Sequence, residues 1–171
     1  MLENLFCLGL VGAAIALIFA LIQAKKVLGF SEGNELMQKL AASIRKGANA
    51  YLKRQYTTVA KIFIIVFVIL LLLAWQGMLD NWFIPFAFLT GGIYSGLAGF
   101  IGMKIATSAN ARTANAAHES LNRGLNVAFS SGAVMGFTVV GLGLLDVSIW
   151  FHILKYIAGF EAAKIAQTMV M

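Results

Sequence analysis

The side chains that could perform chemistry are few and widely spaced in this sequence. His118 and Glu119 are the closest approach to a metal-binding pair. A metal site needs several converging ligands and a second shell of partners, and adjacent positions on a helix do not converge. Asp146 ends an apolar segment and is followed closely by Trp150. An acid deep in a membrane is a functional candidate by default. We interpret Asp146 as an outer-interface residue, with a role in an ion relay as the alternative.

Motifs for nucleotide binding and nucleophilic catalysis do not occur in the sequence. It has no P-loop, no paired-cysteine motif and no Gly-x-Ser-x-Gly, and its seven acidic residues are dispersed. Chemistry on a phosphorylated substrate through several metal ions needs acids that lie close together. We therefore expect no catalytic, substrate-binding or metal-binding residue in this chain, and no bound cofactor.

The composition places these residues in a membrane. The chain has 171 residues, of which 60% are hydrophobic and 12% are charged. A soluble domain averages about 45–50% apolar and about 25% charged residues. Too few charges are present to cover a soluble globule. The formal charge of +6 then indicates basic loops on the cytoplasmic side rather than nucleic-acid binding.

Four uncharged stretches of 18 to 23 residues separate the charged positions. A helix needs about 20 apolar residues to cross the hydrocarbon, and lipid offers no partners for an unpaired backbone. We predict an all-α, polytopic membrane protein with one membrane domain over residues 1–171. Its spans are expected at about residues 4–24, 58–79, 82–106 and 125–148.

The basic residues predict the orientation of these spans. Glu3 precedes the first span, and Lys25 and Lys26 follow it. Of the 13 basic residues, 11 lie at the connection between spans one and two or at the connection between spans three and four. Positive charges remain in the cytoplasm. We therefore predict that segments 25–57 and 107–124 are cytoplasmic and that both termini lie outside. If the source is bacterial, the membrane is expected to be the inner membrane.

The first cytoplasmic segment is predicted to be an amphipathic helix continuous with the second span. Ser31 could cap it, and neither glycine nor proline interrupts residues 48–76, which could form a rod of roughly 43 Å. The bulky run from Ile62 to Leu73 predicts a helix that faces lipid.

Small residues predict packing by the other three spans. Gly92 and Gly96 form a GxxxG pair in the third span, and Gly132 and Gly136 form another in the fourth. Small residues four apart allow helix backbones to approach closely. We expect spans one, three and four to pack against protein, either within one chain or, alternatively, as a specific dimer seam.

Two stretches resemble a known family, the membrane-bound, ion-translocating inorganic pyrophosphatases. Residues 37–56 are similar to its I-x-x-G-A-x-A-[FY]-L-x-x-x-Y segment. Residues 96–117 contain its G-M-x-x-A-T-x-A-N-x-R-T-A-x-A-A segment. The matching residues to which we assign no catalytic role are Gly47, Ala48, Tyr51, Leu52, Tyr56, Gly102, Met103, Asn110, Arg112 and Thr113.

The resemblance implies that cytoplasmic pyrophosphate hydrolysis drives export of protons or sodium ions, with Mg²⁺ and in some members K⁺ as cofactors. Family members are several times longer and carry their aspartate-rich ligands on later helices. This chain therefore resembles an amino-terminal portion, whose helices belong to an outer ring. The implied partners are the remaining helices, a second copy of the pump and the lipid bilayer, with no nucleic acid.

Two other functions are compatible with the residues alone. One is an autonomous four-helix carrier or channel, for which Asp146 is the weak candidate. The other is a non-catalytic subunit that assembles with other membrane proteins through its small-residue faces. The reading frame beyond Met171 would discriminate among them, since the pump predicts that aspartate-rich helices follow.

Overall fold

Long helices make up almost all of the chain. The computed structural model describes residues 2–79, 81–161, 164–165 and 168, with side chains described from Leu8 onward. Its elements are α1 (Leu2–Leu28), α2 (Glu35–Trp75), α3 (Phe83–Glu119), α4 (Leu121–His152) and a π-helical turn, η1 (Ile153–Ile157). Four helices are long and apolar enough to cross a membrane. The prediction of an all-α protein with four membrane-spanning helices is confirmed.

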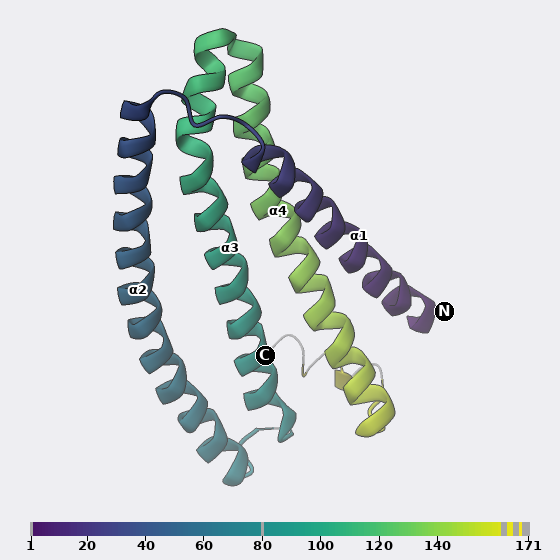
Figure 1. Cartoon of the computed structure of the whole chain (residues 1–171). Helices are drawn as coiled ribbons and strands as arrows, with labels where there is room; N and C mark the ends of the chain where they lie inside the picture. Colours follow the sequence, from purple (N-terminus) through teal and green to yellow (C-terminus); the bar gives the residue numbers. More distant parts are fainter. Residues whose placement is uncertain (1, 80, 162–163, 166–167, 169–171) are drawn as a thin grey trace.

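The helices stand side by side in the order α2, α3, α4, α1 (Figure 1). α4 packs against both α3 and α1, whereas α2 packs against α3 alone among the described elements. The α1–α2 connection and the α3–α4 turn lie at the same end of the molecule (Figure 1). We call this the hairpin end; it is the end that the basic residues predict to be cytoplasmic.

α2 is a single helix of 41 residues, about 60 Å long at 1.5 Å per residue. The predicted continuity of the amphipathic segment with the second span is confirmed. Its predicted start is wrong, however, because Asn34 and not Ser31 is the N-cap: Asn34 Oδ1 accepts a hydrogen bond from the Met37 amide at 2.9 Å. The Ser31 hydroxyl instead accepts a hydrogen bond from the Gly33 amide. Gly33 has a positive φ of 86°, a conformation that favours glycine.

The segment expected as a second cytoplasmic loop is almost entirely helical. α3 continues to Glu119 and α4 begins at Leu121, so Ser120 alone separates them. Its extended backbone reverses the chain, and its hydroxyl accepts from the Arg123 amide. His118 and Glu119 are therefore the last two residues of α3. The glycine at position 124 permits this tight turn, because a Cβ there would lie 2.6 Å from that of Ala117.

Small residues join α1 to α4, as the sequence predicts. A Cβ at Gly9 would lie 2.6 Å from Ser148 Oγ, and one at Gly141 would lie 2.8 Å from Leu17 Cγ. Ala13 is fully buried between these helices. With no hydrophobic drive between helices in lipid, such close approach is the main source of attraction.

Much of the bulky run of α2 is exposed, which agrees with the expected lipid-facing helix, but one side of it packs against α3. Its aromatic side chains pack on the glycines of α3, and a Cβ at Gly92 would overlap the ring of Phe63. The Phe63 ring also stacks on Phe88 at 4.9 Å between centroids. Gly132 and Gly136 have no described atom within 4 Å of an added Cβ, so their predicted packing is not made within the described residues.

Two acidic residues lie outside the part of the chain whose side chains are described. Asp80, which separates the second and third predicted spans, lies outside the described residues. Glu3, which helps to set the predicted orientation, lies in α1 but outside the part whose side chains are described.

Candidate functional site

The family-like residues of α2 fall into two groups. Leu52 is buried and Tyr56 half-buried, both in contact with the rest of the chain, while Gly47 and Tyr51 are exposed. No described atom lies within 4 Å of a Cβ added at Gly47. Ala48 is half-buried. Only some of these motif residues therefore pack against the rest of this chain.

The family-like residues of α3 divide in the same way. Gly102 is buried, and a Cβ there would lie 2.8 Å from Met135 Cγ of α4. Met103, Arg112 and Thr113 are half-buried, whereas Asn110 is exposed. The lack of a side chain at Gly102 thus allows α3 to approach α4 closely.

Two side-chain bonds connect α2 with α3. The Tyr56 hydroxyl donates to the Gly96 carbonyl oxygen at 2.5 Å. Lys104 Nζ donates to Asn49 Oδ1 at 2.7 Å. The two bonds lie about two helical turns apart along α2 and fix the register of the two helices.

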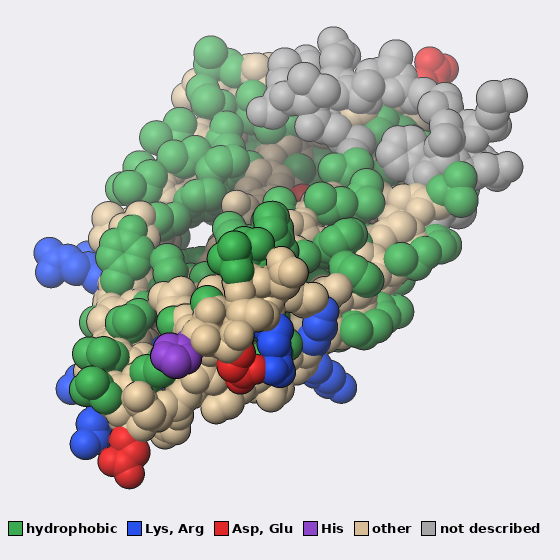
Figure 2. All heavy atoms as spheres, turned by 90° about the horizontal axis from the view of Figure 1, so that it is seen from above, with side chains coloured by type: hydrophobic (Ala, Val, Ile, Leu, Met, Phe, Trp, Pro, Cys, Tyr) green, Lys and Arg blue, Asp and Glu red, His purple; other side chains and the backbone are tan. Residues whose placement is uncertain are grey.

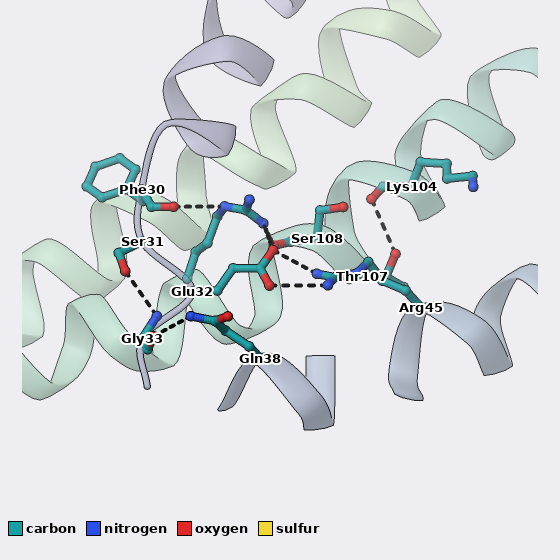
Figure 3. A network of polar contacts seen from close by, with 10 residues as sticks. Phe30, Ser31, Glu32, Gly33, Gln38, Arg45, Lys104, Thr107 and Ser108 are labelled. Atoms are coloured by element: carbon teal, nitrogen blue, oxygen red, sulfur yellow. Dashed lines mark hydrogen bonds and ion pairs between the residues drawn. The ribbon is translucent and has the colours of Figure 1, made fainter. Parts of the chain in front are cut away.

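A denser polar cluster ties the α1–α2 connection to both helices (Figure 3). Glu32 accepts from Arg45 Nη1 at 2.8 Å and Nη2 at 3.2 Å. Its Oε1 also lies 2.8 Å from Arg112 Nη1. Arg112 donates through Nε to the Phe30 carbonyl at 2.9 Å and through Nη1 to the Ser108 carbonyl. We call Glu32, Arg45, Arg112 and the Phe30 carbonyl the arginine junction.

The electrostatics of the arginine junction favour a charged carboxylate. The hydrogen bonds from Arg45 lower the pKa of Glu32, and the charge of Arg112 adds to this, while partial burial opposes it. The side chain of Glu32 is 19% exposed and that of Arg112 only 13%. An opposite charge within hydrogen-bonding distance stabilises the ionised form more than such partial burial destabilises it.

Sequence reasoning missed most of this junction. Arg112 is part of a family-like motif, but Glu32 lies outside both motifs. The Arg112 partners Phe30 and Glu32 are about 80 residues away in sequence. No local spacing reports such a contact. At the same end, Lys26 Nζ donates to Asn126 Oδ1 at 2.8 Å and joins α1 to α4.

Asp146 lies within α4, six residues before its end. α4 continues to His152 and η1 follows. Asp146 is half-buried between α4 and α3 and lines a cleft of about 340 Å³ together with Gly91. The nearby Thr90 hydroxyl donates to the Ala87 carbonyl oxygen at 3.1 Å and accepts from Trp150 Nε1 at 2.6 Å.

The described residues do not offer a site for Mg²⁺. No three His, Cys, Asp or Glu side chains come together among them. Glu119, at the end of α3, forms an ion pair with Arg123, near the start of α4. His118 is exposed. The chemistry available at the hairpin end is therefore the pairing of arginines with one carboxylate and with backbone carbonyls.

The fold and composition define an integral, multi-pass membrane protein built from closely packed helices. A family model described as inorganic H⁺ pyrophosphatase matches residues 14–171. The chain belongs to this family, and the resemblance drawn from its two motifs is confirmed.

Individual relatives agree with this assignment. The chain is 50% identical over 158 residues to a candidate K⁺-stimulated pyrophosphate-energized sodium pump of Bacteroides thetaiotaomicron. It is 45% identical over 141 residues to the K⁺-insensitive pyrophosphate-energized proton pump 2 of Moorella thermoacetica and 40% over 147 residues to a K⁺-insensitive proton pump of Methanosarcina mazei. These matches cover 92%, 82% and 86% of the chain but 22%, 20% and 21% of the relatives. The chain thus spans about a fifth of their length.

Proposed function

We propose that these helices form part of the outer ring of a pyrophosphate-energized proton or sodium pump. In that pump, hydrolysis of pyrophosphate on the cytoplasmic side drives ion export, with Mg²⁺ bound by acids on helices outside this chain. The share of the relatives that the chain matches, about a fifth, is consistent with such a portion.

The role proposed for this portion is structural. The observation that carries it is the arginine junction, which joins the α1–α2 connection, α2 and α3 at the hairpin end through charged hydrogen bonds. Such bonds, with an ionised donor or acceptor, are about twice as strong as neutral ones. Helices held in this way would brace the catalytic helices and form a collar around the cytoplasmic entrance.

Association with the remaining helices of the pump, and of two pumps as a homodimer, is proposed from the family resemblance. The open glycine face at Gly132 and Gly136 supports the first of these contacts, because it has no described neighbour within 4 Å of an added Cβ. Close approach of another helix is the use to which such a face is best suited.

The test compares the 171-residue chain with the complete product of the gene that encodes it. We expect Mg²⁺-dependent pyrophosphate hydrolysis and ion uptake by inverted membrane vesicles for the complete product and neither for the chain alone. A pH-sensitive dye and a ²²Na⁺ assay distinguish the two ions. Hydrolysis by the chain alone would refute the absence of an active site, and an inactive complete product would refute the pump.

A further inference from the structure

An apolar groove runs between α2 and α3 on the side that no described helix covers. It encloses about 520 Å³ and is lined mainly by aromatic and aliphatic side chains and by two α3 glycines. Tyr56, Phe63 and Phe67 form the α2 wall, and Leu97 and Phe100 belong to the α3 wall. Viewed from the hairpin end, the molecule is hollowed beside α2 (Figure 2).

The length of the groove matches one leaflet of a bilayer. The α2 wall extends from Tyr56 to Phe67, which corresponds to about 16 Å at 1.5 Å per residue. Half of a hydrocarbon core about 30 Å thick is about 15 Å. The wall begins near the predicted cytoplasmic end of the second span, so the groove lies at the depth of the cytoplasmic leaflet.

The mouth of the groove is basic. Lys104 Nζ lies 5.5 Å from the centre of the Phe100 ring and bonds Asn49 across to α2. Lys53 lies one turn from both Asn49 and Tyr56 on the same face of α2, by its four- and three-residue spacing. Residues 36–76 and 83–118 contain no acidic residue. The acidic residues of the two helices, Glu35 at the start of α2 and Glu119 at the end of α3, therefore lie several helical turns away from Lys53 and Lys104.

We propose that this groove binds an anionic phospholipid, with one acyl chain along the aromatic wall and the phosphate at Lys53 and Lys104. Basic pockets between membrane helices on the cytoplasmic side are suited to anionic headgroups. The long lysine side chains can extend to the interface while their stems cover apolar surface. This binding site goes beyond the proposed function and does not depend on it.

The apolar wall and the basic mouth make separate predictions. A site that only accommodated acyl chains would not distinguish phosphatidylcholine from phosphatidylglycerol or cardiolipin. A purely electrostatic attraction would depend on the total number of lysines and not on those at the mouth. The proposed site requires both the shape of the groove and the position of the two charges.

The experiment is native mass spectrometry of the complete gene product in detergent, titrated with cardiolipin, phosphatidylglycerol or phosphatidylcholine of the same acyl chain. Lys53→Gln with Lys104→Gln removes the charge at the mouth. Lys39→Gln with Lys46→Gln removes the same charge elsewhere on α2 as the matched control. We expect about thirty-fold weaker binding of anionic lipid for the first pair, from the contribution of each lysine near an anionic group, and less than about three-fold for the second.

A steric variant keeps the proposal falsifiable if the charge variants misfold. Ala60 lines the groove and Ile62 does not, so Ala60→Phe should prevent lipid binding while Ile62→Phe should leave it unchanged. Circular dichroism and gel filtration check each variant. Equal losses in both lysine pairs, equal binding of phosphatidylcholine, unaltered binding by Ala60→Phe, or no bound lipid because another helix fills the groove would each overturn the proposal.

Discussion

Replacing Glu32 by glutamine should release the α1–α2 connection from α2 and α3. Glutamine has the same size and keeps one acceptor oxygen, but it loses the charge that both Arg45 and Arg112 face. The side chain of Arg45 is 32% exposed, so its pair with Glu32 contributes no more than about 1 kcal/mol. The contact with the less exposed Arg112 falls at the lower end of the range for bonds to charged groups, about 1.5 kcal/mol. Allowing for the bond that glutamine retains, we expect a loss of about 2 kcal/mol.

Hydrogen exchange measured by mass spectrometry on residues 29–40 tests this estimate. The amides of Phe30, Met37 and Gln38 are hydrogen-bonded within or beside the connection. A loss of about 2 kcal/mol corresponds to roughly thirty-fold faster exchange through local opening. Glu35→Gln is the matched control, because it removes an exposed acid from the same segment and should cost less than about 1 kcal/mol. Exchange within two-fold of wild type in Glu32→Gln would refute the role of the junction.

The same junction predicts a pH dependence. The pKa of Glu32 is lowered from its ordinary value of 4.5 in the folded protein. The unfolded or opened state therefore binds the proton more tightly, and the stabilisation by Glu32 is complete above about pH 4.5. It is lost as the pH falls through the lowered pKa of the folded state. The difference in local opening between wild type and Glu32→Gln should be constant at neutral pH and disappear in this acidic range.

Three further substitutions, one of them with a matched control, test other contacts. Tyr56→Phe removes the bond to the α3 carbonyl and should lower stability by about 0.5–1.5 kcal/mol in SDS-induced unfolding; an unchanged transition would contradict the tie. Gly124→Ala should lower the free energy of unfolding by about 1–3 kcal/mol in the same assay, because the added methyl meets backbone across the hairpin. Gly132→Ala is the control: it has open space around the added methyl, so the 171-residue chain should unfold as wild type does. Gly47→Leu should leave the folding of the 171-residue chain intact but reduce pyrophosphate hydrolysis by the complete gene product, and unchanged hydrolysis would show that its face is free in the pump.

The sequence predicts features that depend on composition along one helix. The gaps between charges located all four helices, and the absence of glycine and proline in residues 48–76 predicted that α2 continues without a break. Both properties depend on the backbone requirement of a membrane span, which acts on each segment separately. The first residue of a helix was harder to predict where two nearby residues could each act as the N-cap. Ser31 and Asn34 are both good caps, and only the structure shows that Asn34 accepts the Met37 amide.

Contacts between distant segments could not be predicted. Arg112 belongs to a motif, but its bond to the Phe30 carbonyl depends on how α1 ends and how α3 is oriented. The tight turn at Ser120 was hidden for another reason. Residues 107–124 are polar enough to resemble a loop, although each half is helical up to one extended residue. Polarity reports contact with water, and a helix outside the membrane is as polar as a loop.

The division of the motif residues connects the chain to the pump proposed for it. Tyr56, Gly102 and Arg112 are accounted for within the chain, since each contacts another helix or the α1–α2 connection. Gly47 and Tyr51 lie one turn apart on one exposed face of α2, so no contact described within the chain explains why they belong to the same motif. We expect this face to contact other helices of the pump, so that α2 serves both as a wall for α3 and as a connection to the catalytic region.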